Sequence, residues 1–109
     1  MTTTARITQL REAIARRALT DIGVPVDARI LDVQRVGTVF IVATAEPNNR
    51  WSPYTVETFR TSTADDIDPR DEDDAAAKRW IPLAGWNGDG ADEVPGMLAQ
   101  AVAYAREVA

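Results

Sequence analysis

The side chains that most often carry out catalysis are scarce in this chain. Its 109 residues include no cysteine and no histidine, which excludes disulfides, thiolate nucleophiles, Cys/His zinc sites and imidazole acid–base catalysis. The other common nucleophiles are Ser52, Ser62 and Lys78. A glycine-rich phosphate loop and a Gly-x-Ser-x-Gly motif are also missing. The sequence therefore predicts a protein that is not an enzyme and that uses no cofactor and no metal.

Carboxylates are plentiful, and they gather in the stretch DDIDPRDEDD at residues 65–74. A calcium loop of the EF-hand type needs a glycine at its sixth position and oxygen ligands at alternate positions. This stretch contains no glycine and places Arg70 and Ala75 where ligands would be needed. Two interpretations stay open: a solvated, mobile acidic loop over residues 61–77, or carboxylates that contact a basic partner.

The net charge of −5 is a property of that segment. Outside it, ten acidic residues face eleven basic ones. Arg6, Arg11, Arg16 and Arg17 are spread around a predicted helix, and the domain lacks the basic footprint of a nucleic-acid-binding protein. We therefore expect no direct contact with nucleic acid. Glu57 is expected to form a cross-strand pair with Arg29 or Arg35.

The most distinctive candidate site is the stretch EPNNRWSPYTVETF, residues 46–59. A pocket lined by tryptophans and rimmed by polar side chains would stack a flat ligand or a partner's side chain. The alternative is that these aromatic residues close the core of a small sheet. The predicted binding residues are Asn49, Arg50, Trp51, Tyr54 and Trp80.

Hydrophobic spacing predicts the elements that position these residues. Residues 4–22 carry apolar side chains three and four apart, which predicts a helix. Three segments, of alternating pattern or apolar on both faces, predict consecutive strands, and their short connections make them antiparallel. Those segments are residues 28–36, 38–45 and 52–59.

The end of the chain predicts one more strand and a second helix. Residues 79–86 read as a short extended piece that Pro82 confines to an edge. Asp92 is predicted to cap the N-terminus of the last helix, with Pro95 in its first turn.

The fold class that follows is α+β, in a single two-layer domain over residues 1–109. The predicted order is α-β-β-β-(β)-α, with an antiparallel sheet of three to four strands and both helices on one face. Residues 38–45 are apolar on both faces, so the second face also needs cover. Candidates for that cover are residues 61–86, a second copy of the chain, or a partner.

These patterns together predict a small protein-binding module, with a homodimer among its expected assemblies. The alternative is a binder of a nucleotide-like ligand, with an aromatic pocket around Trp51 and Trp80 and a contribution from Arg50. No apolar run approaches the ~18 residues that span a bilayer, and the N-terminus does not read as a secretory signal, so we expect a cytoplasmic protein without membrane contact. The bias towards Ala, Asp and Arg suggests an actinobacterial or phage origin, which would suit a regulatory or anti-defence role.

Overall fold

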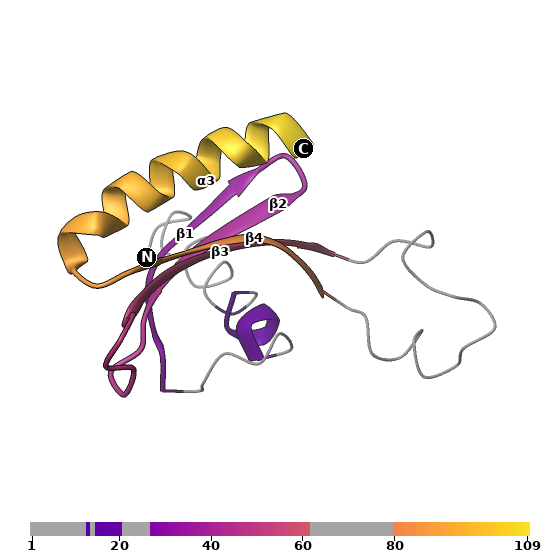
Figure 1. Ribbon diagram of the computed structural model, residues 1–109. Helices are drawn as coiled ribbons and strands as arrows, with labels where there is room; N and C mark the ends of the chain where they lie inside the picture. The colour runs from indigo at the N-terminus through magenta and orange to yellow at the C-terminus, as the bar shows by residue number, and fades with distance from the viewer. Residues whose placement is uncertain (1–12, 14, 21–26, 62–79) are drawn as a thin grey trace, which may run out of the picture.

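The chain folds around a four-stranded antiparallel sheet, seen in a computed structural model that describes residues 13, 15–20, 27–61 and 80–109 (Figure 1). A short helical segment at residues 15–20 precedes the sheet. The other elements are β1 (Arg29–Val36), β2 (Val39–Ala45), β3 (Tyr54–Thr61), β4 (Trp80–Gly88), the 3-10 turn η2 (Ala91–Glu93) and α3 (Val94–Val108). The predicted α+β class and element order are confirmed, and the fourth strand is present.

One face of the sheet packs against α3, whose buried side chains recur at intervals of four residues. Small side chains at two of these positions let the helix lie close to β2 and β3, and Tyr54 and Trp86 pack around the edge of this cluster. Its buried members are Val39, Ile41, Ala43, Val56, Met97, Ala101 and Ala105.

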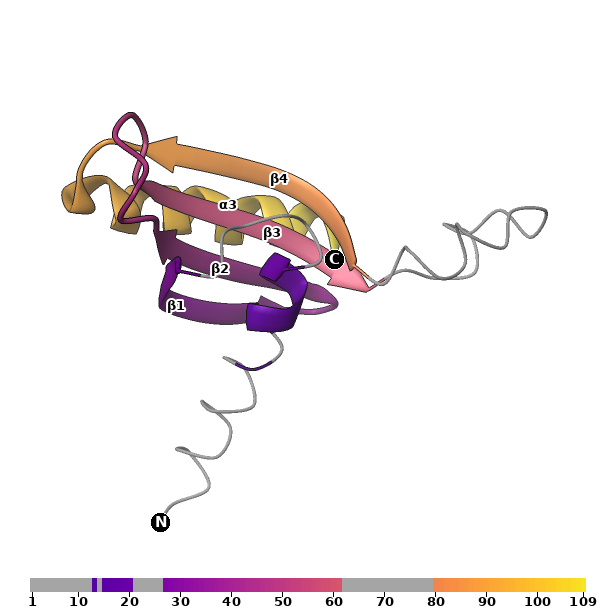
Figure 2. The same ribbon diagram turned by 90° about the horizontal axis from the view of Figure 1, so that it is seen from below.

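The opposite face packs against the N-terminal helical segment, so the prediction that both helices share one face is wrong (Figure 2). Successive side chains of β2 point to opposite faces of the sheet, and both faces are apolar. Each face therefore packs against its own helix. The buried members of this second cluster are Ala15, Ala18, Leu19, Val42 and Phe59. The sheet therefore lies between two helical layers, and the cover that the sequence left open comes from residues 15–20 together with Trp80.

Both ends of the sheet order are edge strands, and β4 is the edge that Pro82 predicts. The pairing of β3 with β4 shifts between Glu57 and Phe59. At this irregularity the Thr58 hydroxyl donates to the Ala84 carbonyl at 2.7 Å and accepts from the Ala84 amide at 2.8 Å. A buried side chain thus completes the backbone hydrogen bonding that the bulge interrupts.

The start of the C-terminal helix differs from its prediction. Asp92 lies inside η2, and the capping carboxylate belongs to Glu93, whose Oε2 accepts from the amides of Asp89 (2.6 Å) and Gly90 (2.9 Å). The 3-10 turn begins at Ala91, one residue before Asp92. The backbone amides of Asp89 and Gly90, just before the turn, therefore lie within reach of the Glu93 carboxylate and not of Asp92. Pro95 occupies the first turn of α3, as predicted.

Two predicted features fall mostly outside the described residues. Of the acidic loop predicted at 61–77, only Thr61 is described, and it ends β3. Of the helix predicted at 4–22, residues 13 and 15–20 are described and are helical. Among the described residues, no helix is both long and apolar enough to cross a membrane.

Candidate binding site at the β2–β3 turn

The turn between β2 and β3 is held in one shape by the side chain of Asn49. Its Oδ1 accepts hydrogen bonds from the backbone amides of Trp51 (3.0 Å) and Ser52 (3.1 Å). Its Nδ2 donates to the Ser52 carbonyl at 3.0 Å, and its backbone amide donates to the Glu46 carbonyl at 3.1 Å. The Glu46 amide closes the base of the turn by donating to the Pro53 carbonyl at 2.7 Å. Asparagine favours such local bonds because its short amide reaches nearby backbone groups.

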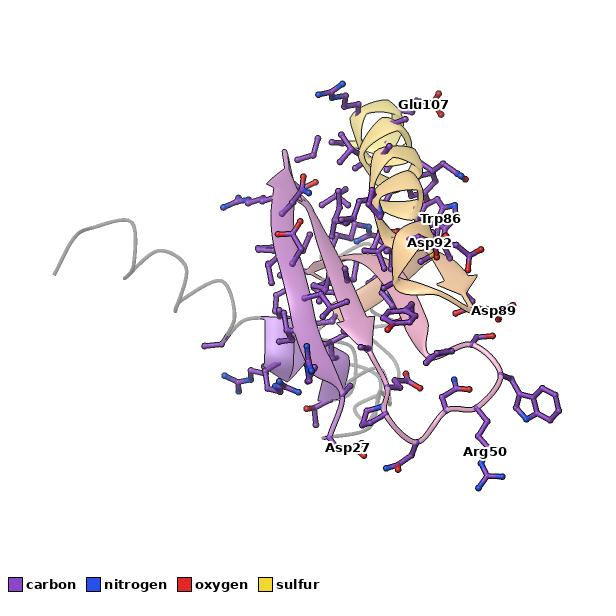
Figure 3. The ribbon with its side chains drawn as sticks, turned by 90° about the vertical axis from the view of Figure 1, so that its left-hand side faces the viewer. Asp27, Arg50, Trp86, Asp89, Asp92 and Glu107 are labelled. Carbon is purple, nitrogen blue, oxygen red and sulfur yellow. The ribbon has the colours of Figure 1, made fainter. Side chains whose placement is uncertain are left out.

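This fixed backbone presents Trp51 to solvent. The Trp51 side chain is 87% exposed, whereas Leu31 and Val108, the other large hydrophobic residues that are exposed in the described part of the chain, are 39% and 49% exposed. Arg50 beside it is also exposed and extends outward from the turn (Figure 3). A tryptophan this exposed contributes little to the core, and its indole is available for contact with another molecule.

An open cavity of about 560 Å³ lies beside Trp51. Asn48 joins two of its walls, because its Nδ2 donates to Oδ2 of Asp27 at 2.5 Å across the gap between the turn and the start of β1. The lining residues are Asp27, Glu46, Asn48, Asn49, Arg50 and Trp51. The site therefore combines two carboxylates, two amides, one guanidinium and one indole.

The structure brings together three of the five predicted binding residues, namely Asn49, Arg50 and Trp51. Tyr54 lies opposite Ala45 and Gly88 and packs at the edge of the core under α3. Trp80 pairs with Thr61 at the far end of β3, roughly 20 Å along the strand from the turn. A pocket shared by Trp51 and Trp80 is therefore not formed.

Trp80 has a packing role instead, as the alternative interpretation of the aromatic residues predicts. Its ring meets those of Phe40 and Phe59 edge-on, with centroids 5.7 and 5.4 Å away. Such edge contacts are a favoured geometry for aromatic pairs in a core. The Trp80 Nε1 is buried, and no group in the described part of the chain accepts its hydrogen.

Sequence reasoning missed Asp27 and Glu46 as members of the site. Glu46 lies within residues 46–59, and its negative charge could have indicated it as a residue of the site. Asp27 has no local signal, because it is brought to the turn only by the register in which Arg29 pairs with Ala45. That register follows from cross-strand packing and not from the residues around Asp27.

Glu57 adds a further carboxylate near this end of the sheet. Burial, and secondarily the charge of Glu46, raise the pKa of the Glu57 carboxyl above its ordinary value of 4.5. The carboxylate lies over Gly85 of β4, where an added Cβ would come within 2.8 Å of Oε2.

The expected cross-strand pair between Glu57 and Arg29 or Arg35 is not formed. The strand β2 lies between them, so these arginines pair with Ala45 and Phe40 and not with β3. The Arg35 guanidinium instead lies 5.4 Å from the centroid of the Phe40 ring and donates from Nε to the Gly37 carbonyl at 2.9 Å.

The described residues contain no group of three or more acidic, histidine or cysteine side chains that could hold a metal ion. Comparison of the chain with protein families, with curated proteins and with solved structures gave no significant match. The geometry of the turn is therefore the basis for a functional assignment.

Proposed function

We propose that this protein is a non-enzymatic, cytoplasmic protein-binding module whose contact surface is the β2–β3 turn, with Trp51 at its centre. The observation that supports this proposal most is the exposure of Trp51 on a backbone that Asn49 holds in place. Tryptophan and arginine are the residues most enriched among those that dominate protein–protein binding energy, and here they are adjacent.

The energetics favour a contact of this kind. Burying a tryptophan removes on the order of 150–250 Å² from water, which is worth roughly 4–6 kcal/mol before the costs of association. The hydrogen bonds of Asn49 already order the Trp51 backbone, so binding loses less conformational entropy there than it would in a loose loop.

A nucleotide-like ligand, the alternative predicted from the sequence, has less support. Asp27 and Glu46 line the same cavity as Arg50, and their carboxylates would repel phosphate groups. The predicted aromatic pocket around Trp51 also lacks Trp80, which lies at the other end of β3.

A homodimer belongs to the proposal as one form that the partner could take. The sheet faces no longer argue for it, because both have helical cover. What supports it is α3, whose Gly96, Ala99 and Ala103 are exposed and would allow a second helix to approach closely. Light scattering over a wide range of protein concentrations tests it, since a monomer throughout would remove the dimer from the proposal.

Affinity capture from the producing cells tests the proposal as a whole, with Trp51→Ala compared against Val108→Ala. Val108 is the matched control because it is an exposed apolar residue on α3, remote from the turn along the chain. We expect Trp51→Ala to lower recovery of specific partners at least ~10-fold, and Val108→Ala to leave it unchanged. Equal recovery with both variants would contradict the proposal.

A further inference from the structure

We propose that the cavity beside Trp51 receives an arginine side chain of the protein partner. This inference rests on the proposed function and specifies the chemistry of the partner. Its basis is the combination, in one cavity of about 560 Å³, of two carboxylates with an exposed indole.

Each carboxylate accepts one side-chain hydrogen bond and retains acceptor capacity. The Asn48 side chain donates from Nδ2 to Oδ2 of Asp27. The Asn49 side chain donates from Nδ2 to Oε2 of Glu46 at 3.3 Å. Of the hydrogen bonds between described residues, none uses Oδ1 of Asp27 or Oε1 of Glu46. Two anchored carboxylates with open oxygens suit a guanidinium, which donates several hydrogen bonds in a planar fork.

The indole supplies the second half of the recognition. Trp51 lines the cavity while most of its surface stays exposed, so it can cover an inserted side chain. An arginine stem packs on apolar surface, and its cationic group is attracted to the face of an aromatic ring. Lysine would gain the charge attraction without the planar stacking or the forked hydrogen bonds.

The charges that line the cavity favour a single cation. Within the lining, Asp27 and Glu46 outnumber Arg50, which stands at the rim and extends outward (Figure 3). Two further cations flank the cavity: Arg29, two residues after Asp27, pairs with Ala45 beside Glu46, and the Arg16 guanidinium donates to the carbonyl of Ala28 at 2.6 Å. Glu57, whose charge interacts with that of Glu46, adds a third carboxylate at this end of the sheet. Arg50 would then favour an acidic residue next to the partner's arginine.

The direct test is an NMR titration of the labelled full chain with N-acetyl-arginine methylamide. We expect saturable shifts at the amides of Asn48 and Asn49 and at the indole N–H of Trp51. The citrulline analogue, which has nearly the same shape and no charge, should give at most one tenth of the affinity. Equal shifts with both compounds, or none with arginine, would overturn the inference. A lysine analogue that binds as tightly as the arginine one would overturn the choice of arginine.

A second test of the arginine inference uses a double variant, Asp27→Asn with Glu46→Gln. It keeps the shapes of the side chains and removes both charges, and its spectrum shows directly whether it is folded. We expect it to bind the arginine probe at least ~10-fold more weakly and to lose the captured partner.

The two proposals fail in different ways. If Trp51→Ala loses the partner and the double variant keeps it with full affinity, the arginine inference is wrong while the proposed function holds. If Trp51→Ala keeps every partner, the proposed function itself is wrong.

Discussion

At the scale of single residues, Asn49 decides how the turn can act. Five hydrogen bonds, four of its side chain and one of its backbone amide, connect it to Glu46, Trp51 and Ser52 at 3.0–3.3 Å. A turn without them would still connect β2 to β3, but Trp51 would sample many orientations. The side chain of Asn49 therefore gives the turn one defined backbone conformation, from which Trp51 is presented to solvent.

Asn49→Ala should destabilise the protein by about 1–2 kcal/mol, because the turn loses the hydrogen bonds of the Asn49 side chain to the Trp51 and Ser52 backbone. Urea unfolding measures that loss, and amide hydrogen exchange should show faster exchange at both residues. Asn48→Ala is the matched control, since its side chain makes one hydrogen bond among the described residues, to exposed Asp27, and should cost less than about 1 kcal/mol. Equal effects of the two substitutions would show that Asn49 does not order the turn.

Glu57 should make the stability of the protein pH-dependent. Burial raises the pKa of its carboxyl in the folded chain, so the folded state holds this proton more tightly than the unfolded state does. Ionisation of Glu57 therefore favours unfolding. Its destabilising effect is absent well below the ordinary pKa of 4.5, grows as the pH rises through the ordinary and then the raised value, and is complete well above the raised value.

Glu57→Gln should accordingly stabilise the protein at pH 7 and change its stability little at pH 3. Chemical denaturation at the two pH values measures the difference, and each variant serves as its own control. A destabilised variant at pH 7 would mean that the ionised carboxylate has a favourable partner in the fold.

At the scale of elements, the β1–β2 turn and the end of α3 meet at Gly37. This residue has a φ of 60°, in the region where side chains other than glycine are disfavoured. A Cβ built there would also lie 2.8 Å from Cβ of Ala109, so the C-terminus closes over the turn. Gly37 therefore both forms the β1–β2 turn and leaves room for Ala109, the residue after α3.

Gly37→Ala should lower the free energy of unfolding by about 1–2 kcal/mol, through backbone strain and the contact with Ala109. Gly96→Ala on α3 is the matched control, because nothing lies within 4 Å of the added methyl group and alanine is the better helix former. It should stabilise the protein by up to about 1 kcal/mol. Thermal unfolding that ranked the two variants in the reverse order would contradict this account of the β1–β2 turn.

The elements also show which parts of the structure the sequence could predict. Alternating side chains made β2 and β3 predictable, and Pro82 marked β4 as an edge, because these signals are local. The bulge at Thr58 had no such signal, since it depends on a hydroxyl bonding to Ala84 on the next strand. The layer order was missed because an apolar stripe on a helix does not say which sheet face it will cover.

The candidate site was predictable in part for the same reason. Asn49, Arg50 and Trp51 are neighbours in the chain, so turn-forming residues beside an aromatic residue were enough to indicate them. Asp27 enters the site through strand register, and Trp80 leaves it through the length of β3. Both positions are set by the pairing and the length of the strands, and no short stretch of sequence specifies them.

At the scale of the whole molecule, packing and recognition occupy separate regions. The two apolar clusters lie between the sheet and its helices, and the turn that carries Trp51 joins β2 and β3 at one end of the sheet (Figures 1 and 2). Because of this separation, a change at Trp51 should affect binding without affecting folding. Phe59, in the same hairpin, is fully buried and provides the opposite case.

The most direct test of the central claim is to measure unfolding free energy and partner affinity on the same Trp51→Ala protein. We expect the unfolding free energy to stay within about 0.5 kcal/mol of the parent and the affinity for the captured partner to fall at least ~10-fold. Phe59→Ala calibrates the stability measurement, with an expected loss of about 3–5 kcal/mol. A Trp51→Ala protein that is clearly destabilised and binds its partner as tightly as the parent would contradict the account.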